Sequence, residues 1–254
     1  MTKIPTFAII TDFGFDFSVA SMKALILCHC PDARIIDIDH SIERFSILSA
    51  AFVLDKVYQY FPDNTIFICV IDPGVGSRRD IFCVETKKYK FIGPNNGIFH
   101  YILKNNEIDQ KIYKVKDNFT DIPSNTFHGR DIITPVAIEL AKGNHSFFEP
   151  VNKKDIVFIP ALESGTFIIL YIDGFGNIKT NISVDTNYIA NSKILTLKIN
   201  NIFHEIRFVK TFSDVENGEL LCYKGSNNTI EIAVNLGSAK DALSVEVGDI
   251  IYIE

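Results

Sequence analysis

Tryptophan is absent from this sequence, methionine occurs twice, and the five cysteines include no C-x-x-C pair. An odd number of cysteines without that spacing argues against a disulfide framework and favours a reducing compartment, so we expect a cytoplasmic protein. Apolar runs of the ~20 residues that a membrane helix needs are also missing, as is a basic leader followed by an apolar core and a cleavage site. We therefore expect no membrane partner.

Basic residues are too few for a nucleic-acid-binding surface. The 25 lysines and arginines are outnumbered by 31 aspartates and glutamates, which gives a net charge of -6, whereas such a surface needs clustered positive charge. Zinc ligands at a recognisable spacing are lacking too. Cys28, His29 and Cys30 are neighbours on an expected helix, so they point in different directions and cannot converge on one ion. We predict neither a nucleic-acid partner nor a bound metal.

The first half of the chain alternates between strand and helix patterns. Runs of β-branched and apolar residues predict strands, and apolar residues at helical spacing predict helices. These patterns follow one another at residues 6–10 (strand), 15–30 (helix), 34–38 (strand), 46–60 (helix), 65–71, 81–85 and 90–92 (strands) and 134–141 (helix). The alternation is typical of a mostly parallel sheet covered by helices, so we predict an α/β N-terminal domain over residues 1–155.

The second half has short apolar runs bounded by turn residues and no long helical pattern. Strands are predicted at residues 165–172, 194–199, 202–209, 229–234 and 249–253. Strands at this spacing are typical of a small antiparallel barrel or sandwich. We therefore predict an all-β C-terminal domain, a small barrel over residues 160–254, with the boundary between residues 150 and 164.

The most informative run is D-P-G-V-G-S-R-R at residues 72–79, which follows the predicted buried strand at 65–71. In open α/β sheets, ligands bind where loops leave the carboxyl ends of strands. Glycines at such a place let a ligand approach the backbone closely. D-P-G alone is as typical of an ordinary turn, but the second glycine and the two arginines favour a functional site.

Further motifs follow in an order that resembles one family. They are T-D-F-G at 11–14, the run at 72–79, G-P-N-N-G at 93–97, F-H-G-R-D at 127–131, I-D-G-F-G-N at 172–177 with T-N at 180–181, and E-I-A-V-N at 231–235 with G-S-A at 237–239. Across almost its whole length, the chain resembles the S-adenosyl-L-methionine hydroxide adenosyltransferases, relatives of the bacterial fluorinase and chlorinase. The resemblance implies an α/β domain, a β-barrel domain and a homotrimer with active sites between subunits. It also implies that water or hydroxide displaces methionine from the ribose C5′ of S-adenosyl-L-methionine, giving adenosine and L-methionine without a cofactor.

Three side chains match the positions that carry this chemistry: Asp72, Arg79 and His128. A carboxylate, a guanidinium and an imidazole around one water could orient it, accept its proton and stabilise developing hydroxide. The sulfonium leaving group needs no acid. Spacing from Asp72 assigns the family's arginine to Arg79 and not to Arg78. Taken alone, His128 could instead have a structural role, as a histidine in a turn that hydrogen-bonds to the backbone.

The resemblance also assigns residues that bind the substrate. Asp12 would accept both ribose hydroxyls, although an aspartate here could instead cap the following helix. Five more of these residues lie in the second half of the chain. Asp173 and Ser226 would hold the amine and carboxylate of methionine. Asn177 and Asn235 would bind the adenine, and Phe175 would offer it a ring face. Phe175 and Asn177 could instead have only a structural role, with Asn177 forming a turn and Phe175 packing against it.

Two other functions remain open at this stage. A halide adenosyltransferase would share the substrate and fold, but Asp72 would repel a halide at close range. The third possibility is a non-catalytic sensor of S-adenosylmethionine or adenosine. The only residue that favours a sensor is Asn95, at a position where the family usually has aspartate. The substitution removes a charge and keeps a hydrogen-bond acceptor.

Overall fold

The computed structural model describes residues 4–105, 109–119, 125–184 and 193–253. The chain divides into two compact units, Met1–Ile159 and Pro160–Glu254. Each unit has its own sheet and its own hydrophobic core. No helix of the described residues is long and apolar enough to cross a membrane.

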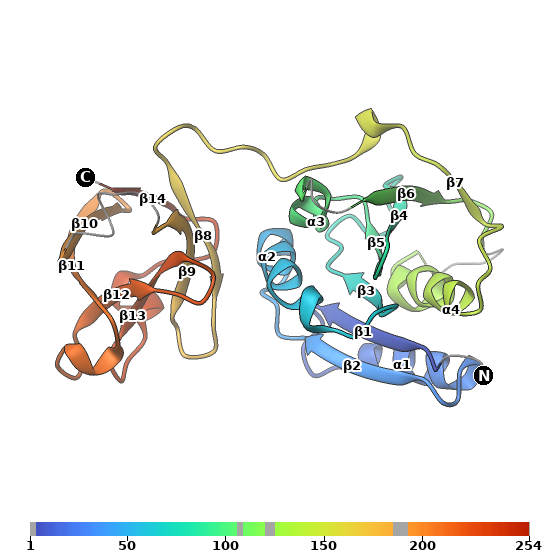
Figure 1. The fold of residues 1–254 in the computed structure, drawn as a ribbon, viewed down its shortest axis with the longest axis horizontal. Coiled ribbons are helices and arrows are strands. Elements are labelled where there is room, and N and C mark those ends of the chain that lie inside the picture. Colours follow the sequence, from blue (N-terminus) through green and yellow to red (C-terminus); the bar gives the residue numbers. More distant parts are fainter. Residues whose placement is uncertain (1–3, 106–108, 120–124, 185–192, 254) are drawn as a thin grey trace. The chain divides into compact units, whose positions relative to one another are not determined.

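The first unit is built on a seven-stranded sheet with the order β2-β1-β3-β5-β4-β6-β7 (Figure 1). Its strands are β1 (Thr6–Thr11), β2 (Arg34–Asp39), β3 (Ile66–Val70), β4 (Ile81–Thr86), β5 (Lys90–Pro94), β6 (Gln110–Val115) and β7 (Phe148–Pro150). Pairing is parallel from β2 through β1 and β3 to β5, and antiparallel from β5 through β4 and β6 to β7. The central strands β1 and β3 are buried along their whole length, as apolar strands covered on both faces must be.

Helices cover both faces of this sheet (Figure 1). They are α1 (Phe17–His29), α2 (Ile47–Val57), α3 (His100–Lys104) and α4 (Thr134–Ala141), with 3₁₀ turns η1 (Tyr58–Tyr60) and η3 (Lys153–Asp155) and the π-helical turn η2 (Gly129–Ile133). α1 and α4 pack together over one face, where Met22 and Val136 join Ile9 and Ile68 in one core. α2 and α3 pack against each other elsewhere on the unit.

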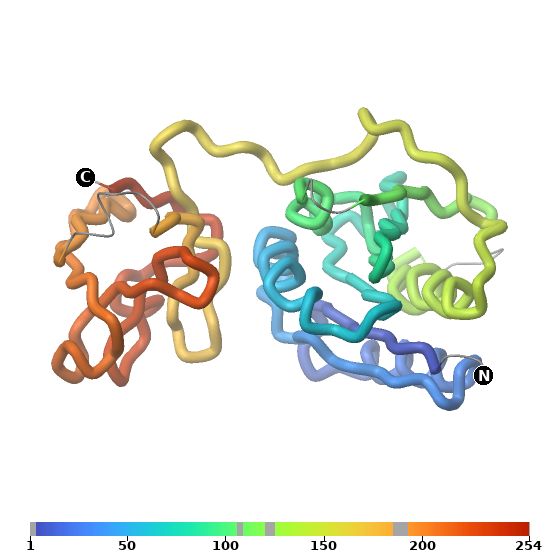
Figure 2. Tube along the Cα trace, viewed as in Figure 1, coloured from blue at the N-terminus to red at the C-terminus, as the bar shows by residue number. Residues whose placement is uncertain are grey.

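The second unit is a closed barrel with the strand order β10-β11-β12-β13-β9-β8-β14. Its strands are β8 (Phe167–Ile172), β9 (Ile178–Ser183), β10 (Ile194–Ile199), β11 (Ile202–Val209), β12 (Leu220–Lys224), β13 (Thr229–Val234) and β14 (Ile250–Ile253), and it also holds the short helices η4 (Phe212–Asp214) and α6 (Ala239–Leu243). The Cα trace in Figure 2 can be followed to β14, which closes the barrel by pairing with both β8 and β10. Alternate side chains, such as Ile178 and Ile182, fill the interior.

The predicted fold class is confirmed: an α/β unit is followed by an all-β barrel. The sheet is mixed, because β4 runs antiparallel to both of its neighbours, β5 and β6, and β7 runs antiparallel to β6. α1 starts at Phe17 since the Asp16 side chain accepts a hydrogen bond from the Ser18 N–H at 2.6 Å and caps the helix. The alternative reading of Asp12 as the helix cap is therefore wrong.

Candidate functional site

A cavity of about 350 Å³ lies at the carboxyl ends of β1 and β3, the two central parallel strands. Asp12 follows β1 in its lining, and Asp72 follows β3. His128, from the segment before η2, also lines it. These strand ends are where open α/β sheets place their ligands. The fold thus brings together three of the predicted residues from three distant parts of the chain.

Asp72 and Arg79 form a buried, forked ion pair within this site. The Arg79 Nε donates to Asp72 Oδ1 at 2.7 Å and to Oδ2 at 2.9 Å, and Nη2 also donates to Oδ2. The two side chains are 6% and 11% exposed, respectively. A planar guanidinium suits this arrangement because its donors match both oxygens of a carboxylate. The pair holds a negative and a positive group rigidly at the cavity.

The glycines of the 72–79 run allow the tight turn that returns Arg79 to Asp72. Backbone hydrogen bonds from Val75 N–H to Asp72 O and from Ser77 N–H to Gly74 O fold the segment. Gly76 has a φ of +79°, and a Cβ there would lie 2.6 Å from the backbone oxygen of Asn125. Both facts require glycine at this position.

His128 completes the cluster through its Nδ1, to which Arg79 Nη2 donates at 2.9 Å. A guanidinium can only donate, so Nδ1 accepts and the neutral ring carries its proton on Nε2. Burial, and then the charge of Arg79, lower the pKa of His128 below its ordinary value, against the smaller opposing effects of Asp72 and Asp131. The ring is therefore neutral at pH 7, with an Nε2–H available as a donor.

The local backbone explains why His128 lies there. It directly precedes the π-helical turn η2, a rare geometry that is frequent at functional sites. A Cβ at Gly129 would lie 3.0 Å from Cγ1 of Val70, so the small residue lets the turn pack closely against the end of β3. His128 is thereby brought to the same strand end as Asp72.

Asp12 lines the cavity and has one carboxylate oxygen engaged: Oδ2 accepts a hydrogen bond from the Phe45 N–H at 2.9 Å. Phe45 has a φ of +67°, which is unusual for a bulky residue, and its side chain is 67% exposed. Among the described residues, no other partner of the Asp12 carboxylate is present. Lone pairs remain for a ligand hydroxyl.

Arg78 and Asn95, the latter at a position where the family usually has aspartate, both lie outside the cavity lining. Arg78 is exposed and, within the described part of the chain, makes no ion pair or hydrogen bond through its side chain. Asn95 donates from Nδ2 to the Asp155 carbonyl at 2.7 Å and accepts from the Val157 N–H at 2.9 Å. An ionised aspartate could not make the first of these bonds. Asn95 therefore fastens residues 155–157 to the loop that follows β5.

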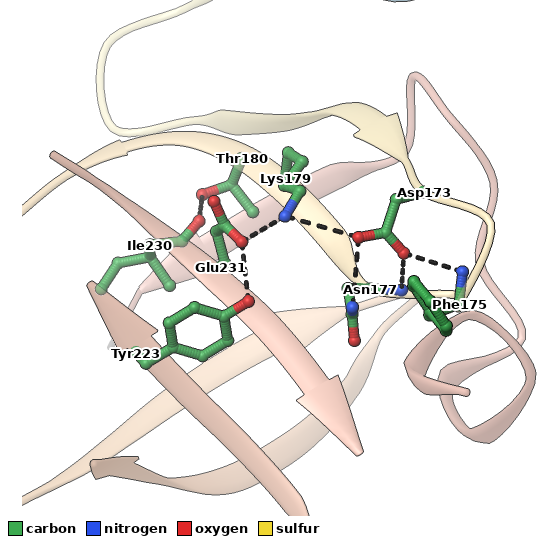
Figure 3. Close-up of polar contacts among 8 residues, drawn as sticks. All are labelled: Asp173, Phe175, Asn177, Lys179, Thr180, Tyr223, Ile230 and Glu231. Atoms are coloured by element: carbon green, nitrogen blue, oxygen red, sulfur yellow. Dashed lines mark hydrogen bonds and ion pairs between the residues drawn. The ribbon is translucent and has the colours of Figure 1, made fainter. Parts of the chain in front are cut away.

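In the barrel, the turn between β8 and β9 holds Asp173, Phe175 and Asn177 (Figure 3). Asp173 Oδ1 accepts from the backbone N–H groups of Phe175 and Asn177, both at 3.0 Å, and Oδ2 accepts from Asn177 Nδ2 at 3.1 Å. Phe175 is 82% exposed, whereas Asn177 is 9% exposed. Asn177 is thus part of the turn that Asp173 organises, and the Phe175 ring and Oδ2 of Asp173 have room for ligand contacts.

The other two predicted residues lie elsewhere on the barrel. Ser226 is exposed in the turn between β12 and β13. Asn235 follows β13, and its Nδ2 donates to the Val215 carbonyl at 3.0 Å. All five predicted barrel residues belong to the second unit, whereas Asp12, Asp72, Arg79 and His128 belong to the first.

Sequence reasoning missed one polar cluster, formed by Tyr223, Glu231 and Lys179 (Figure 3). Glu231 faces Lys179 across β13 and β9, and Tyr223 across β12 and β13. β9 and β12 were not predicted as strands. A period-2 reading of I-K-T-N-I-S at 178–183 would have predicted β9 as a strand, because its buried positions alternate with more exposed ones.

Comparisons with known proteins agree over nearly the whole chain. Residues 7–148 match the sequence model of the SAM hydroxide adenosyltransferase N-terminal domain, and residues 167–252 match that of the C-terminal domain. The (R)-S-adenosyl-L-methionine hydrolase of Methanocaldococcus jannaschii is 35% identical, with 96% of this chain and 93% of the relative covered. The fluorinase of Actinopolyspora mzabensis is 27% identical, with 96% and 97% covered. A crystal structure of an uncharacterized conserved protein from Thermotoga maritima matches with a TM-score of 0.87 at 31% identity, covering 98% of this chain and 100% of that one. This chain therefore belongs to the SAM hydroxide adenosyltransferase family.

Proposed function

We propose that this protein hydrolyses S-adenosyl-L-methionine to adenosine and L-methionine, by attack of water or hydroxide on the ribose C5′. The observation that carries the proposal is the linked Asp72–Arg79–His128 cluster at the cavity that Asp12 also lines. Relatives named (R)-S-adenosyl-L-methionine hydrolase, matched along nearly the full chain, support the same substrate and reaction.

In the proposed mechanism, His128 and Asp72 both act on the attacking water. Nδ1 of His128 is engaged by Arg79, so its Nε2–H donates to the oxygen of the water. Asp72 has lone pairs left beyond those used by Arg79 and accepts a proton from the same water. Arg79 keeps both groups in place and compensates the charge on Asp72. The reaction needs neither an acid nor a cofactor, because the sulfonium leaves as a neutral thioether.

Substrate binding is assigned to the remaining predicted residues. Asp12 holds the ribose hydroxyls through the carboxylate oxygen that Phe45 leaves free. The amino-acid end lies against Asp173 and Ser226. The adenine contacts Asn177, Asn235 and the exposed ring of Phe175.

We further propose a homotrimer, in which the barrel of one subunit completes the cavity of another. Large apolar residues are exposed in the first unit at Phe15 (113%), Phe17 (79%) and the cavity-lining Phe45 (67%), and on the barrel at Phe175 (82%) and Leu236 (84%). Large exposed apolar patches mark interaction surfaces, so these residues support an interface between subunits. Light scattering at several concentrations tests the trimer. A cytoplasmic location remains a prediction from the cysteine pattern.

The halide adenosyltransferase remains the second candidate, and the fluorinase relative is the observation that favours it. Asp72 argues against it, because this carboxylate lines the cavity where a halide would have to lose its hydration shell. Asn95 no longer favours the sensor hypothesis, because its side-chain amide is bonded to the backbone of residues 155–157.

The direct test incubates purified protein with S-adenosylmethionine and follows adenosine and L-methionine by chromatography, with and without a high concentration of chloride. We expect both products in equimolar amounts and no 5′-chloro-adenosine. A chlorinated product would assign the chain to the second candidate, and bound substrate without turnover would assign it to the sensor.

A further inference from the structure

A row of polar residues crosses the outer face of the barrel beside Asp173 (Figure 3). Tyr223 on β12, Glu231 on β13 and Lys179 on β9 lie directly opposite one another in the strand register. Their neighbours Ile178 and Ile232 point into the barrel core. Side chains alternate across a strand, so the three polar residues share the other face.

Glu231 is the centre of this row and is unusually buried for a carboxylate, with 6% of its side chain exposed. It accepts hydrogen bonds at Oε2 from the Lys179 ammonium and, at 2.7 Å, from the Tyr223 hydroxyl. A Cβ at residue 225 would overlap the Glu231 carboxylate, and glycine occupies that position, next to Ser226. Burial and the neighbouring carboxylate raise the pKa of Tyr223, so its hydroxyl remains a donor.

Lys179 lies between two carboxylates. Its Nζ contacts Glu231 Oε2 closely and lies 3.5 Å from Oδ2 of Asp173. Among the described residues, no other cation pairs with Asp173. One cation therefore serves two acids, and it lies nearer to the buried one. The charge of Lys179 is taken up by Glu231, and Asp173 keeps a net negative field for another cation.

We propose that Glu231 determines the specificity of the Asp173 subsite for a cationic ligand group, by neutralising Lys179. This inference rests on the proposed function, in which Asp173 holds the α-ammonium of the substrate. Without the charge of Glu231, the Lys179 ammonium would pair fully with Asp173. The subsite would then contain an internal cation that competes with the ammonium of the ligand.

The experiment compares two substrates: S-adenosylmethionine, and a sulfonium nucleoside in which a second methyl group replaces the amino-acid chain. Only the first carries an ammonium group, so the ratio of their kcat/KM values measures the subsite and cancels losses common to both. We expect Glu231→Gln to lower this ratio about tenfold, as expected when a charge-assisted contact is lost. The double variant Glu231→Gln/Lys179→Met removes both charges and should recover most of the ratio.

Single and control variants sharpen the test. Lys179→Met alone removes the competing cation, so the ratio should stay level or rise. It remains informative if Glu231→Gln fails to fold. Lys198→Met is the matched control, because Lys198 is a barrel lysine whose ammonium lies over the Phe203 ring at 5.5 Å rather than beside a carboxylate. Its ratio should equal that of the wild type.

Equal losses on both substrates in Glu231→Gln would overturn the inference, as would a double variant that is no better than the single one, or a fall of the ratio in Lys179→Met. Failure of the proposed function has a different signature: the wild type would form no adenosine from either substrate. In that case, calorimetry measures the affinities of the same variants for the same two nucleosides, and the ratio of the two affinities replaces the ratio of kcat/KM values. The inference then requires this ratio to fall in Glu231→Gln and to recover in the double variant.

Discussion

Replacing Arg79 by alanine should abolish most activity while leaving a folded protein. In the structure, Arg79 makes the forked contact with Asp72 and donates to His128 at 2.9 Å. Its loss frees Nδ1 of His128, so the tautomer of the ring is no longer fixed. General acid–base assistance is typically worth ~10²–10⁴-fold in rate. We expect kcat to fall within that range and the dissociation constant of S-adenosylmethionine to change far less.

The same substitution has a cost in stability that can be worked from burial. Asp72 is 6% exposed, so removing its partner leaves a nearly buried, uncompensated carboxylate. Breaking one side of such a pair costs about 3–5 kcal/mol. A domain of ordinary stability has roughly 5–15 kcal/mol to lose. Urea unfolding followed by circular dichroism measures this change, and a thermal unfolding curve gives the temperature below which the variant is folded for the kinetic assay.

Arg78→Ala is the matched control, because Arg78 is the next residue, carries the same charge and is exposed. It should retain most activity and unfold like the wild type. Arg79→Lys keeps the charge but loses the fork, and should remain slow. If Arg78→Ala and Arg79→Ala lose activity alike, local positive potential rather than the forked geometry matters, and the assigned cluster is wrong.

Three further predictions concern the same cavity. Asp12→Asn keeps an acceptor for the Phe45 N–H, so it should raise KM with little change in kcat, and calorimetry showing wild-type affinity would remove Asp12 from the ribose site. Because the pKa of His128 is lowered, its ring stays neutral as the pH falls through 6.5. The acid limb of the kcat/KM profile should therefore have its midpoint below pH 6.5. A midpoint at or above pH 6.5 contradicts the role assigned to His128. Gly76→Ala should lower the thermal midpoint and the activity together, because its φ is +79° and its Cβ would meet the Asn125 carbonyl; an unchanged midpoint would show that the loop is not constrained there.

Elements with a clear pattern of buried apolar residues, such as the fully buried strand β3 and the helix α1 with Val19, Met22 and Ile26, were predictable from the sequence. The strand expected at 65–71 is β3 (Ile66–Val70), and the helix expected at 15–30 is α1 (Phe17–His29). Unpredicted strands, such as β6 (Gln110–Val115) and β12 (Leu220–Lys224), are short or half exposed, so their apolar signal is weak. The reversal of direction within the sheet depends on long-range pairing, which local patterns do not encode.

The functional residues were recognisable as motifs, whereas their contacts were not. No spacing rule places His128 beside Arg79, because their sequence separation is 49 residues and the contact depends on η2 and Gly129. Nor does the sequence reveal that Asn95 fastens residues 155–157, or that Lys179 lies between two carboxylates. These contacts arise only when separate strands are assembled into the sheet and the barrel.

The most direct test of the account is the origin of the 5′-oxygen of the product. Turnover of S-adenosylmethionine in ¹⁸O-water should place one heavy oxygen on C5′ of adenosine, detected by mass spectrometry, with unlabelled L-methionine released beside it. The labelled product should appear at the rate of adenosine formation. In Arg79→Ala, that rate should fall as far as the activity does. Adenosine that carries no label would contradict attack by water at C5′, and with it the role assigned to Asp72, Arg79 and His128.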